Sequence, residues 1–292
     1  MLKLFCNTGI KPHSGDPIIN GHQTGEVILE EAKDVPSNDV VCLQSAINRL
    51  NSLVVNVYRI NAVKDSAQEF KDTLSSLNSD SVEVMLVADR RFRSYVLEFD
   101  MFLDYWETAI AHYKRIDMTA EEPKVVSEYK QLFDDLTHSA YDNHVEYQLL
   151  DLIRNQTAHV QSPVNRIHVG INGNEAYSSR DVLLKDCKSG ENKKKILRSQ
   201  PGEIALSSIV DVTEKCLQDI HRYLIDFQID ELIMEDLKHI RRFFEYISSK
   251  GHLYKPWILM DDEIGPKRAQ HIKDMKAYGF LLERLDAIDN AR

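Results

Sequence analysis

Apolar residues recur every three or four positions along most of this chain, which is the spacing of one face of an α-helix. No glycine occurs between Val27 and Val169, so long uninterrupted helices are expected there. Ser37 and Asn38 are favoured helix N-caps and mark the start of the first helix. Its apolar stripe can continue to Leu77 and includes Val40, Leu43, Ile47, Leu50, Val54, Val57, Phe70 and Leu74.

A stripe of aromatic residues predicts the second helix. Asp80 and Glu83 have the spacing of a capping box at its start. The rings follow at helical spacing: Phe92, Tyr95, Phe99, Phe102, Trp106 and Tyr113. Such a stripe is more often a packed core than a cofactor site, so we expect these rings to be buried.

Two shorter helices and a hairpin are predicted next. A capping-box pattern near Thr119 opens the third helix, and the polar residues 138–143 are expected to end it. A fourth helix is expected over about residues 141–160. Alternating apolar residues then lead into Asn172-Gly173, a favoured two-residue turn, which predicts a β-hairpin over about residues 164–178.

The two ends of the chain and one internal stretch depart from the helical pattern. Glycines and prolines crowd the start of the chain, so residues 1–36 are predicted to be an irregular segment. The lysine-rich residues 185–198 are predicted to be a basic loop. Helices resume within residues 203–250, and residues 251–292 form a C-terminal extension that can hold a helix near residues 266–278. The expected fold is therefore mainly α, with one helical domain over residues 37–250 and a small hairpin inserted in it.

Composition narrows the function classes. A chain of 292 residues with a formal net charge of −10 is not a protein that coats nucleic acid generally, although one local cleft can still bind it. Its four cysteines are scattered, which argues against a zinc finger or a disulfide framework. The chain has no signal-peptide pattern and no apolar run of about 18 residues. We expect a soluble, cytoplasmic protein without a membrane partner.

Candidate chemistry lies in the six residues from Arg154 to His159, at the end of the predicted fourth helix. The two side chains start about 140° apart on a regular helix, and a tightened last turn can bring them together. Arginine offers a planar, permanently charged donor for phosphate oxygens, and histidine can transfer a proton near neutral pH. The pair suits cleavage of RNA with the ribose 2′-hydroxyl as nucleophile, which needs no metal, and no cofactor is expected.

This Arg154-Asn155-x-x-x-His159 set resembles the signature of HEPN domains, and the resemblance covers about residues 38–178. It implies an up-and-down helical bundle, a homodimer in which two motifs face each other, and metal-independent endoribonuclease activity. By this resemblance Arg154 and His159 are catalytic and Asn155 is a supporting polar residue. A defence or toxin-like role with an antitoxin or other regulatory protein partner is also implied. Gln161 stands where some toxin members carry a modified tyrosine, so regulation by that modification is not expected.

Other interpretations of the motif stay open. Arg154 can instead form a surface salt bridge with Asp151 or Glu146, and His159 can cap the helix end. The alternative function is a non-catalytic helical module that binds RNA, a nucleotide or a protein partner, and a third is a structural protein with a chance motif. A catalyst is expected to keep Arg154 and His159 unpaired beside a shared cleft, whereas a scaffold can engage them in salt bridges.

Weaker candidates lie outside the motif. Lys193, Lys194 and Lys195 are interpreted either as contacts to an RNA backbone or as an ordinary solvated loop. His138 and His144 lie close together in the sequence, but a metal site would need another ligand, so solvation of a helix break is favoured. His168 lies on a predicted strand, and either a surface position or a position near an active site is compatible with the pattern.

Overall fold

A computed structural model describes residues 2–11, 18–19, 22–23, 26–31, 37–113, 122–157, 162–171, 173–187, 190–249, 257–261 and 270–272. Contacts divide the chain into two compact units, Met1–Val55 with Gln228–Arg292, and Asn56–Phe227. The helix α1 (Ser37–Ser76) contributes to both units.

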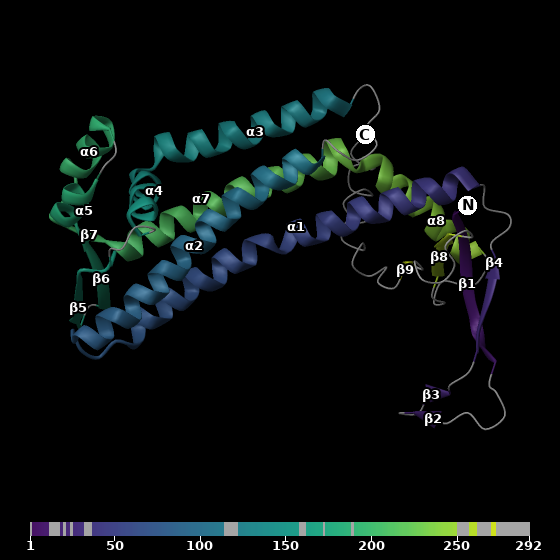
Figure 1. Ribbon diagram of the computed structural model, residues 1–292, viewed down its shortest axis with the longest axis horizontal. Helices are drawn as coiled ribbons and strands as arrows, with labels where there is room; N and C mark the ends of the chain where they lie inside the picture. Colours follow the sequence, from purple (N-terminus) through teal and green to yellow (C-terminus); the bar gives the residue numbers. More distant parts are fainter. Residues whose placement is uncertain are drawn as a thin grey trace. The chain divides into compact units, whose positions relative to one another are not determined.

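The unit Asn56–Phe227 is mainly helical (Figure 1). Beside the second half of α1 it contains α2 (Val82–Tyr113), α3 (Glu122–Asn143), α4 (Val145–Thr157) and α7 (Leu206–Phe227). α7 contacts both α3 and α4, and α2 contacts the same two helices. The mainly helical class predicted from the sequence is confirmed.

Aromatic side chains of α2 form the centre of this unit. Phe92, Tyr95, Phe99, Phe102 and Trp106 are all fully buried, as the stripe predicted. Their neighbours come from other helices: the Phe70 ring of α1 contacts Phe92, and the Tyr147 ring of α4 meets Phe99 edge-on. α2 is therefore the central helix against which the others pack.

The predicted break of the third helix at residues 138–143 is wrong, because α3 continues to Asn143. Polar side chains in this turn bond to carbonyls of their own helix: Thr137 Oγ1 to Phe133, His138 Nδ1 to Asp134 and Asn143 Nδ2 to Ser139. Such local bonds are compatible with helix continuation even though they resemble a loop composition. The break falls at His144, between α3 and α4.

The predicted hairpin is present. β5 (Arg166–Gly170) and β6 (Gly173–Ser179) pair antiparallel with Ile167 opposite Ala176. Gly173 has φ of +117°, a conformation that glycine adopts without strain. β7 (Glu203–Ala205) adds a third strand beside β6 that the sequence did not reveal, since three residues carry too little pattern.

The predicted basic loop at residues 185–198 is wrong for most of its length. α5 (Arg180–Asp186) and α6 (Glu191–Arg198) are helical. Leu183 and Leu197 are buried and anchor these short helices. α6 has only this one buried side chain, so its apolar periodicity is too weak to distinguish it from a charged loop.

The unit Met1–Val55 with Gln228–Arg292 contains a four-stranded antiparallel sheet of order β4-β1-β8-β9. Its strands are β1 (Leu2–Lys11), β4 (Glu26–Glu31), β8 (Trp257–Asp261) and β9 (Gln270–Ile272). β2 (Ile18–Ile19) pairs with β3 (His22–Gln23) separately. The expectation of an irregular segment over residues 1–36 is therefore wrong where these strands lie.

The same unit contains the first half of α1, a π-helical turn η1 (Gln228–Leu232) and α8 (Met234–Ser249). Arg49 of α1 donates from Nε and Nη2 to the nearly buried Asp236 carboxylate of α8. The helix expected near residues 266–278 is wrong at Gln270–Ile272, which form β9, and its other residues lie outside those that the structure describes.

Asn174 anchors the hairpin to the end of α1. Its Nδ2 donates to the carbonyls of Leu74 and Leu77 at 2.8 Å each, at the C-terminal end of α1. Asn174→Ala removes both of these bonds and is expected to cost about 1–2 kcal/mol of unfolding free energy in urea denaturation. Gln131→Ala, which removes only an exposed bond to Asp135, should change it by about 0.5 kcal/mol or less. Equal effects of the two variants would contradict the anchor.

Candidate functional site

Arg154 lies in the last turn of α4 and is held by two carboxylates. Its Nη1 donates to Asp100 Oδ1 of α2 at 2.8 Å, and its Nη2 lies 3.1 Å from Asp151 Oδ1. The side chain is 30% exposed. The sequence suggested Asp151 as a partner, but the bond to Asp100 joins residues that lie 54 positions apart. The salt bridge with Asp151, one of the alternatives open from the sequence, is therefore present, and Arg154 is not unpaired as was expected of a catalyst.

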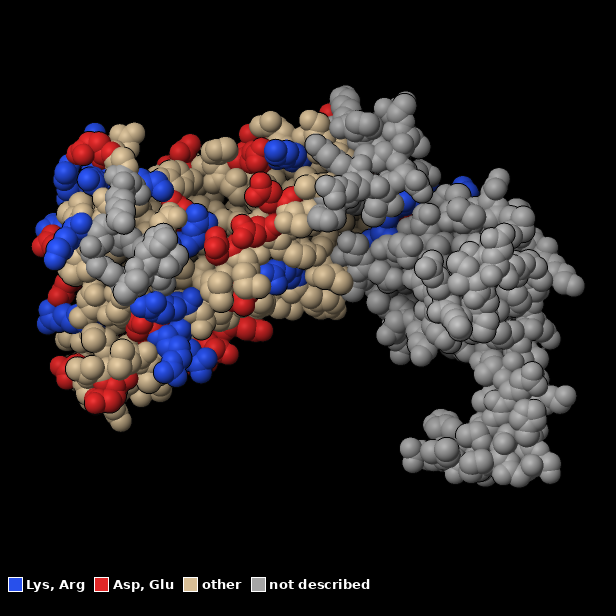
Figure 2. All heavy atoms as spheres, viewed as in Figure 1, with Lys and Arg blue, Asp and Glu red and all other residues tan. Residues whose placement is uncertain are grey.

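The charges continue from α4 to α6. Asp151 also accepts from Lys193 Nζ at 2.7 Å, so Asp100, Arg154, Asp151 and Lys193 form one four-residue charge cluster. The cluster holds two acidic and two basic side chains, so its net charge is zero. On the described part of the viewed face, basic and acidic side chains are interspersed (Figure 2).

The remaining site candidates occupy different positions. Asn155 is exposed and its Nδ2 donates to the Asp151 carbonyl at 2.7 Å, which serves the helix itself. The three candidate lysines lie on α6 and not in a loop: Lys193 is partly buried and paired, Lys194 is partly buried and Lys195 is exposed. Their contact with RNA stays a prediction. His159 lies within residues 158–161, outside the part of the chain that the structure describes.

Asp89 of α2 binds the segment that follows the motif, at Ser162 and Val164. Its Oδ1 accepts from Ser162 Oγ at 2.6 Å and from the Val164 amide at 3.3 Å. Its Oδ2 accepts from Arg93 Nε at 2.7 Å, one turn further along α2. Asp89 is only 7% exposed, so this buried carboxylate has bonds to both of its oxygens.

One face of α2 thus carries contacts to both sides of the motif. Asp89, Arg93, Val96 and Asp100 follow one another at spacings of four, three and four, which place them in one row along the helix. Asp100 holds Arg154, and Asp89 holds Ser162. No feature of the sequence pairs these residues, because the contacts join segments that lie more than 50 positions apart.

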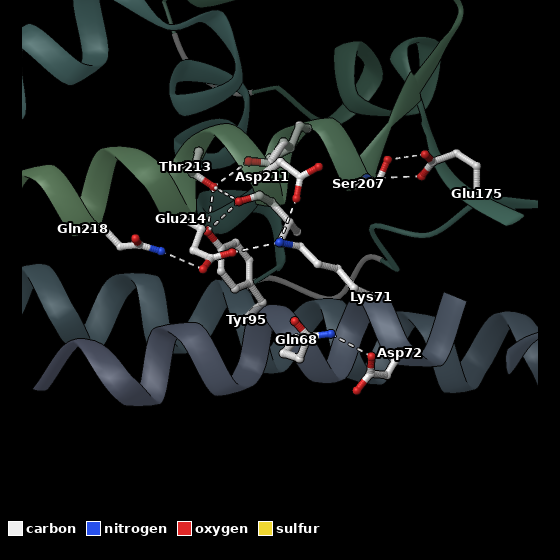
Figure 3. Close-up of polar contacts among 12 residues, drawn as sticks. Gln68, Lys71, Asp72, Tyr95, Glu175, Ser207, Asp211, Thr213, Glu214 and Gln218 are labelled. Carbon is white, nitrogen blue, oxygen red and sulfur yellow. Dashed lines mark hydrogen bonds and ion pairs between the residues drawn. The ribbon is translucent and has the colours of Figure 1, made fainter. Parts of the chain in front are cut away.

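A second polar network lies where α7 packs on α1 and α2 (Figure 3). The Nζ atom of Lys71 on α1 lies 2.7 Å from Asp211 Oδ1 and 2.8 Å from Glu214 Oε2, both on α7. The buried Tyr95 hydroxyl of α2 bonds to Thr213 Oγ1 at 2.7 Å. These groups satisfy one another, and nothing in their geometry presents a reactive atom to a substrate. We interpret the network as structural.

His221 of α7 is the most perturbed histidine of the described chain. It is 8% exposed and its ring lies 5.7 Å from the Trp106 ring and 6.1 Å from the Phe102 ring. Burial lowers its pKa to about 4, against the opposing effect of a bond between its Nε2 and the Val57 carbonyl. His221 carries no sequence signal of its own, because it lies within an apolar helical stripe.

The other histidines do not form a site among the residues that the structure describes. His138 and His144 are exposed, and His168 is exposed on β5. In the described ranges no group of three or more His, Cys, Asp or Glu side chains could hold a metal ion. No described helix is both long enough and apolar enough to cross a membrane.

Comparisons with known proteins do not supply a family. The sequence matches no protein-family model, no curated protein and no solved structure.

Proposed function

We propose that this protein is a metal-independent endoribonuclease of the HEPN type. The observation that supports the proposal is the position of Arg154. Its guanidinium is partly exposed at the end of the motif helix, and carboxylates from two helices fix its orientation. An arginine held in this way can meet a phosphate without first ordering a flexible side chain.

The chemistry assigned to the site follows from the motif. Arg154 stabilises the negative charge that develops on the phosphate oxygens. Its hydrogen bond to Asp100 uses one of its five N–H donors, and Asp151 adds an ion pair. His159 transfers the proton as the ribose 2′-hydroxyl attacks the neighbouring phosphorus. The P–O5′ bond breaks, which gives a 2′,3′-cyclic phosphate and a 5′-hydroxyl. Asn155 is the supporting polar residue.

The test is cleavage of a labelled RNA in the presence of a metal chelator. We expect products that end in a cyclic phosphate, because the nucleophile belongs to the substrate. The same RNA with a 2′-deoxy sugar at the cleavage position is the matched control and should resist. Cleavage that requires a divalent metal, or that proceeds equally at the deoxy position, would contradict the mechanism.

We also propose that the enzyme is a homodimer in which two motifs face each other. Leu97 and Met101, one turn apart on α2, are 58% and 43% exposed beside Asp100 and offer an apolar contact. Sedimentation equilibrium at micromolar concentration should give about twice the chain mass of 33.7 kDa. Leu97→Asp should shift the protein toward the monomer, whereas Val82→Asp, on the first turn of α2, should not. A monomer that cleaves RNA would contradict this assembly.

The ion pairs of Arg154 favour a second candidate function, a non-catalytic helical module that binds RNA, a nucleotide or a protein partner. The charge of Arg154 is already balanced by two carboxylates, as a scaffold permits. RNA binding without cleavage would support this module over the enzyme. A defence or toxin-like role in the cytoplasm, with an antitoxin or other regulatory partner, rests only on the HEPN resemblance.

A further inference from the structure

Asp151 of α4 is shared between two basic side chains. Its Oδ1 lies 3.1 Å from Arg154 Nη2 on the same helix, and its Oδ2 accepts from Lys193 Nζ of α6 at 2.7 Å. The Asp151 side chain is only 18% exposed. Loss of one basic partner would therefore leave a largely buried carboxylate beside the other. The shorter of the two contacts is the one to Lys193.

Lys193 faces α4 because of its place on α6. Leu197, the buried side chain of α6, comes four residues after Lys193 and so lies on the same face of the helix. α6 contacts α4, which carries both Asp151 and Arg154. Lys195 lies about 200° around α6 from Lys193 and is exposed. The packing that buries Leu197 therefore also brings the Lys193 ammonium to Asp151.

The Lys193 ammonium limits how closely Asp151 can pair with Arg154. A carboxylate and a guanidinium form their strongest pair when both carboxylate oxygens meet two N–H donors. Here Lys193 binds one oxygen of Asp151, and the other oxygen lies 3.1 Å from a single nitrogen of Arg154. Without the ammonium, both oxygens would be open to the guanidinium, and a closer pair would take donors away from a phosphate.

We infer that Lys193 is a positioning residue for Arg154: by holding Asp151, it keeps the guanidinium from closing on that carboxylate and leaves it directed at an RNA phosphate. The inference rests on the proposed ribonuclease site, but the coupling of Lys193 to Arg154 can be measured without RNA. The competing role of Lys193 is a direct contact with the RNA backbone. The two roles differ in their dependence on Asp151, since a direct contact does not need that carboxylate.

The first measurement is the rate at which phenylglyoxal modifies Arg154, followed by mass spectrometry. The reagent reacts with the neutral guanidine, so a closer carboxylate slows it. Lys193→Gln should slow this modification by about two- to fivefold, the factor that corresponds to one partly exposed ion pair. Lys193→Arg should restore the wild-type rate, because an arginine can keep the pair with Asp151. Arg198→Gln is the matched control: it removes a cation of α6 that pairs with the exposed Glu191, and the rate should be unchanged.

The same measurement in an Asp151→Asn background separates this coupling from other effects of the substitution. The neutral amide cannot form the competing ion pair, so Lys193→Gln should lose most of its effect on Arg154 there. Slowing of equal size in both backgrounds would overturn the inference, because Lys193 would then act without Asp151. An unchanged rate in Lys193→Gln alone would overturn it as well.

The second measurement is RNA cleavage and binding. Lys193→Gln should lower kcat by about two- to fivefold with little change in KM, because the weakened interaction is made in the transition state. The slope of log affinity against log salt, measured on RNA whose 2′-hydroxyls are methylated, should stay unchanged. A slope that falls by about 0.7 would reveal a direct phosphate contact and contradict the positioning role. If the modification rates of Arg154 behave as expected but the wild type does not cleave RNA, the coupling stands and the ribonuclease proposal alone fails.

Discussion

Replacing His159 with Ala is expected to slow RNA cleavage by about 100- to 10,000-fold, the usual contribution of a positioned proton-transfer group. Arg154→Ala should cause a loss on the same scale, because the guanidinium stabilises charge that develops only in the transition state. The rates should be measured in single-turnover reactions with enzyme in excess, so that product release does not mask the chemical step. Both variants should still yield the cyclic phosphate as their residual product.

The stability of each variant must be measured beside its rate, because Arg154 makes two ion pairs that an exposed helix end would lack. These pairs are partly exposed, so Arg154→Ala should cost about 1 kcal/mol or less of unfolding free energy. Arg198→Ala is the control: it removes an arginine of α6 that pairs with the exposed Glu191, and cleavage should be unchanged. Full activity of the double variant Arg154→Ala, His159→Ala would exclude the catalytic assignment.

The long helices could be predicted from the sequence because their signal is local. The ring stripe of α2 and the glycine-free run of α1 repeat over many turns, so tertiary contacts add little to the choice of helix. The hairpin was predictable for a similar reason, since its turn pair directly precedes the second strand. β1 was not predictable, because its partner β8 lies about 250 positions away in the sequence. Its pairing with β4 also carries a register shift near Gly9.

The candidate site was predictable only in part. The spacing of Asp151 and Arg154 on one helix predicts their ion pair, and the structure contains it. Asp100 and Asp89 belong to the site because α4 and the segment at Ser162 both pack on α2. No local sequence pattern encodes this packing. Lys193 shows the same limit, since its partner Asp151 lies on another helix.

Acidification is expected to destabilise the protein through His221. Burial lowers its pKa in the folded protein to about 4, whereas a histidine in the unfolded chain titrates near 6.5. The unfolded chain therefore binds more protons between these two values. Stability from this residue is complete above about pH 6.5, falls by up to about 1.4 kcal/mol per pH unit below it, and levels off once the folded form is also protonated.

Urea denaturation at pH 7.5 and 5 should reveal this loss, and a variant isolates it. His221→Gln removes the titrating ring, so its unfolding free energy should depend less on pH than that of the wild type. His168→Gln is the control, because His168 is exposed on β5 and should leave the wild-type dependence unchanged. The Nδ1 atom of His221 is buried without a hydrogen-bond partner, so protonation there would place a charged donor beside the Trp106 and Phe102 rings. A His221→Gln protein that loses stability between pH 7.5 and 5 as steeply as the wild type would show that other groups, and not this buried ring, govern the response to acid.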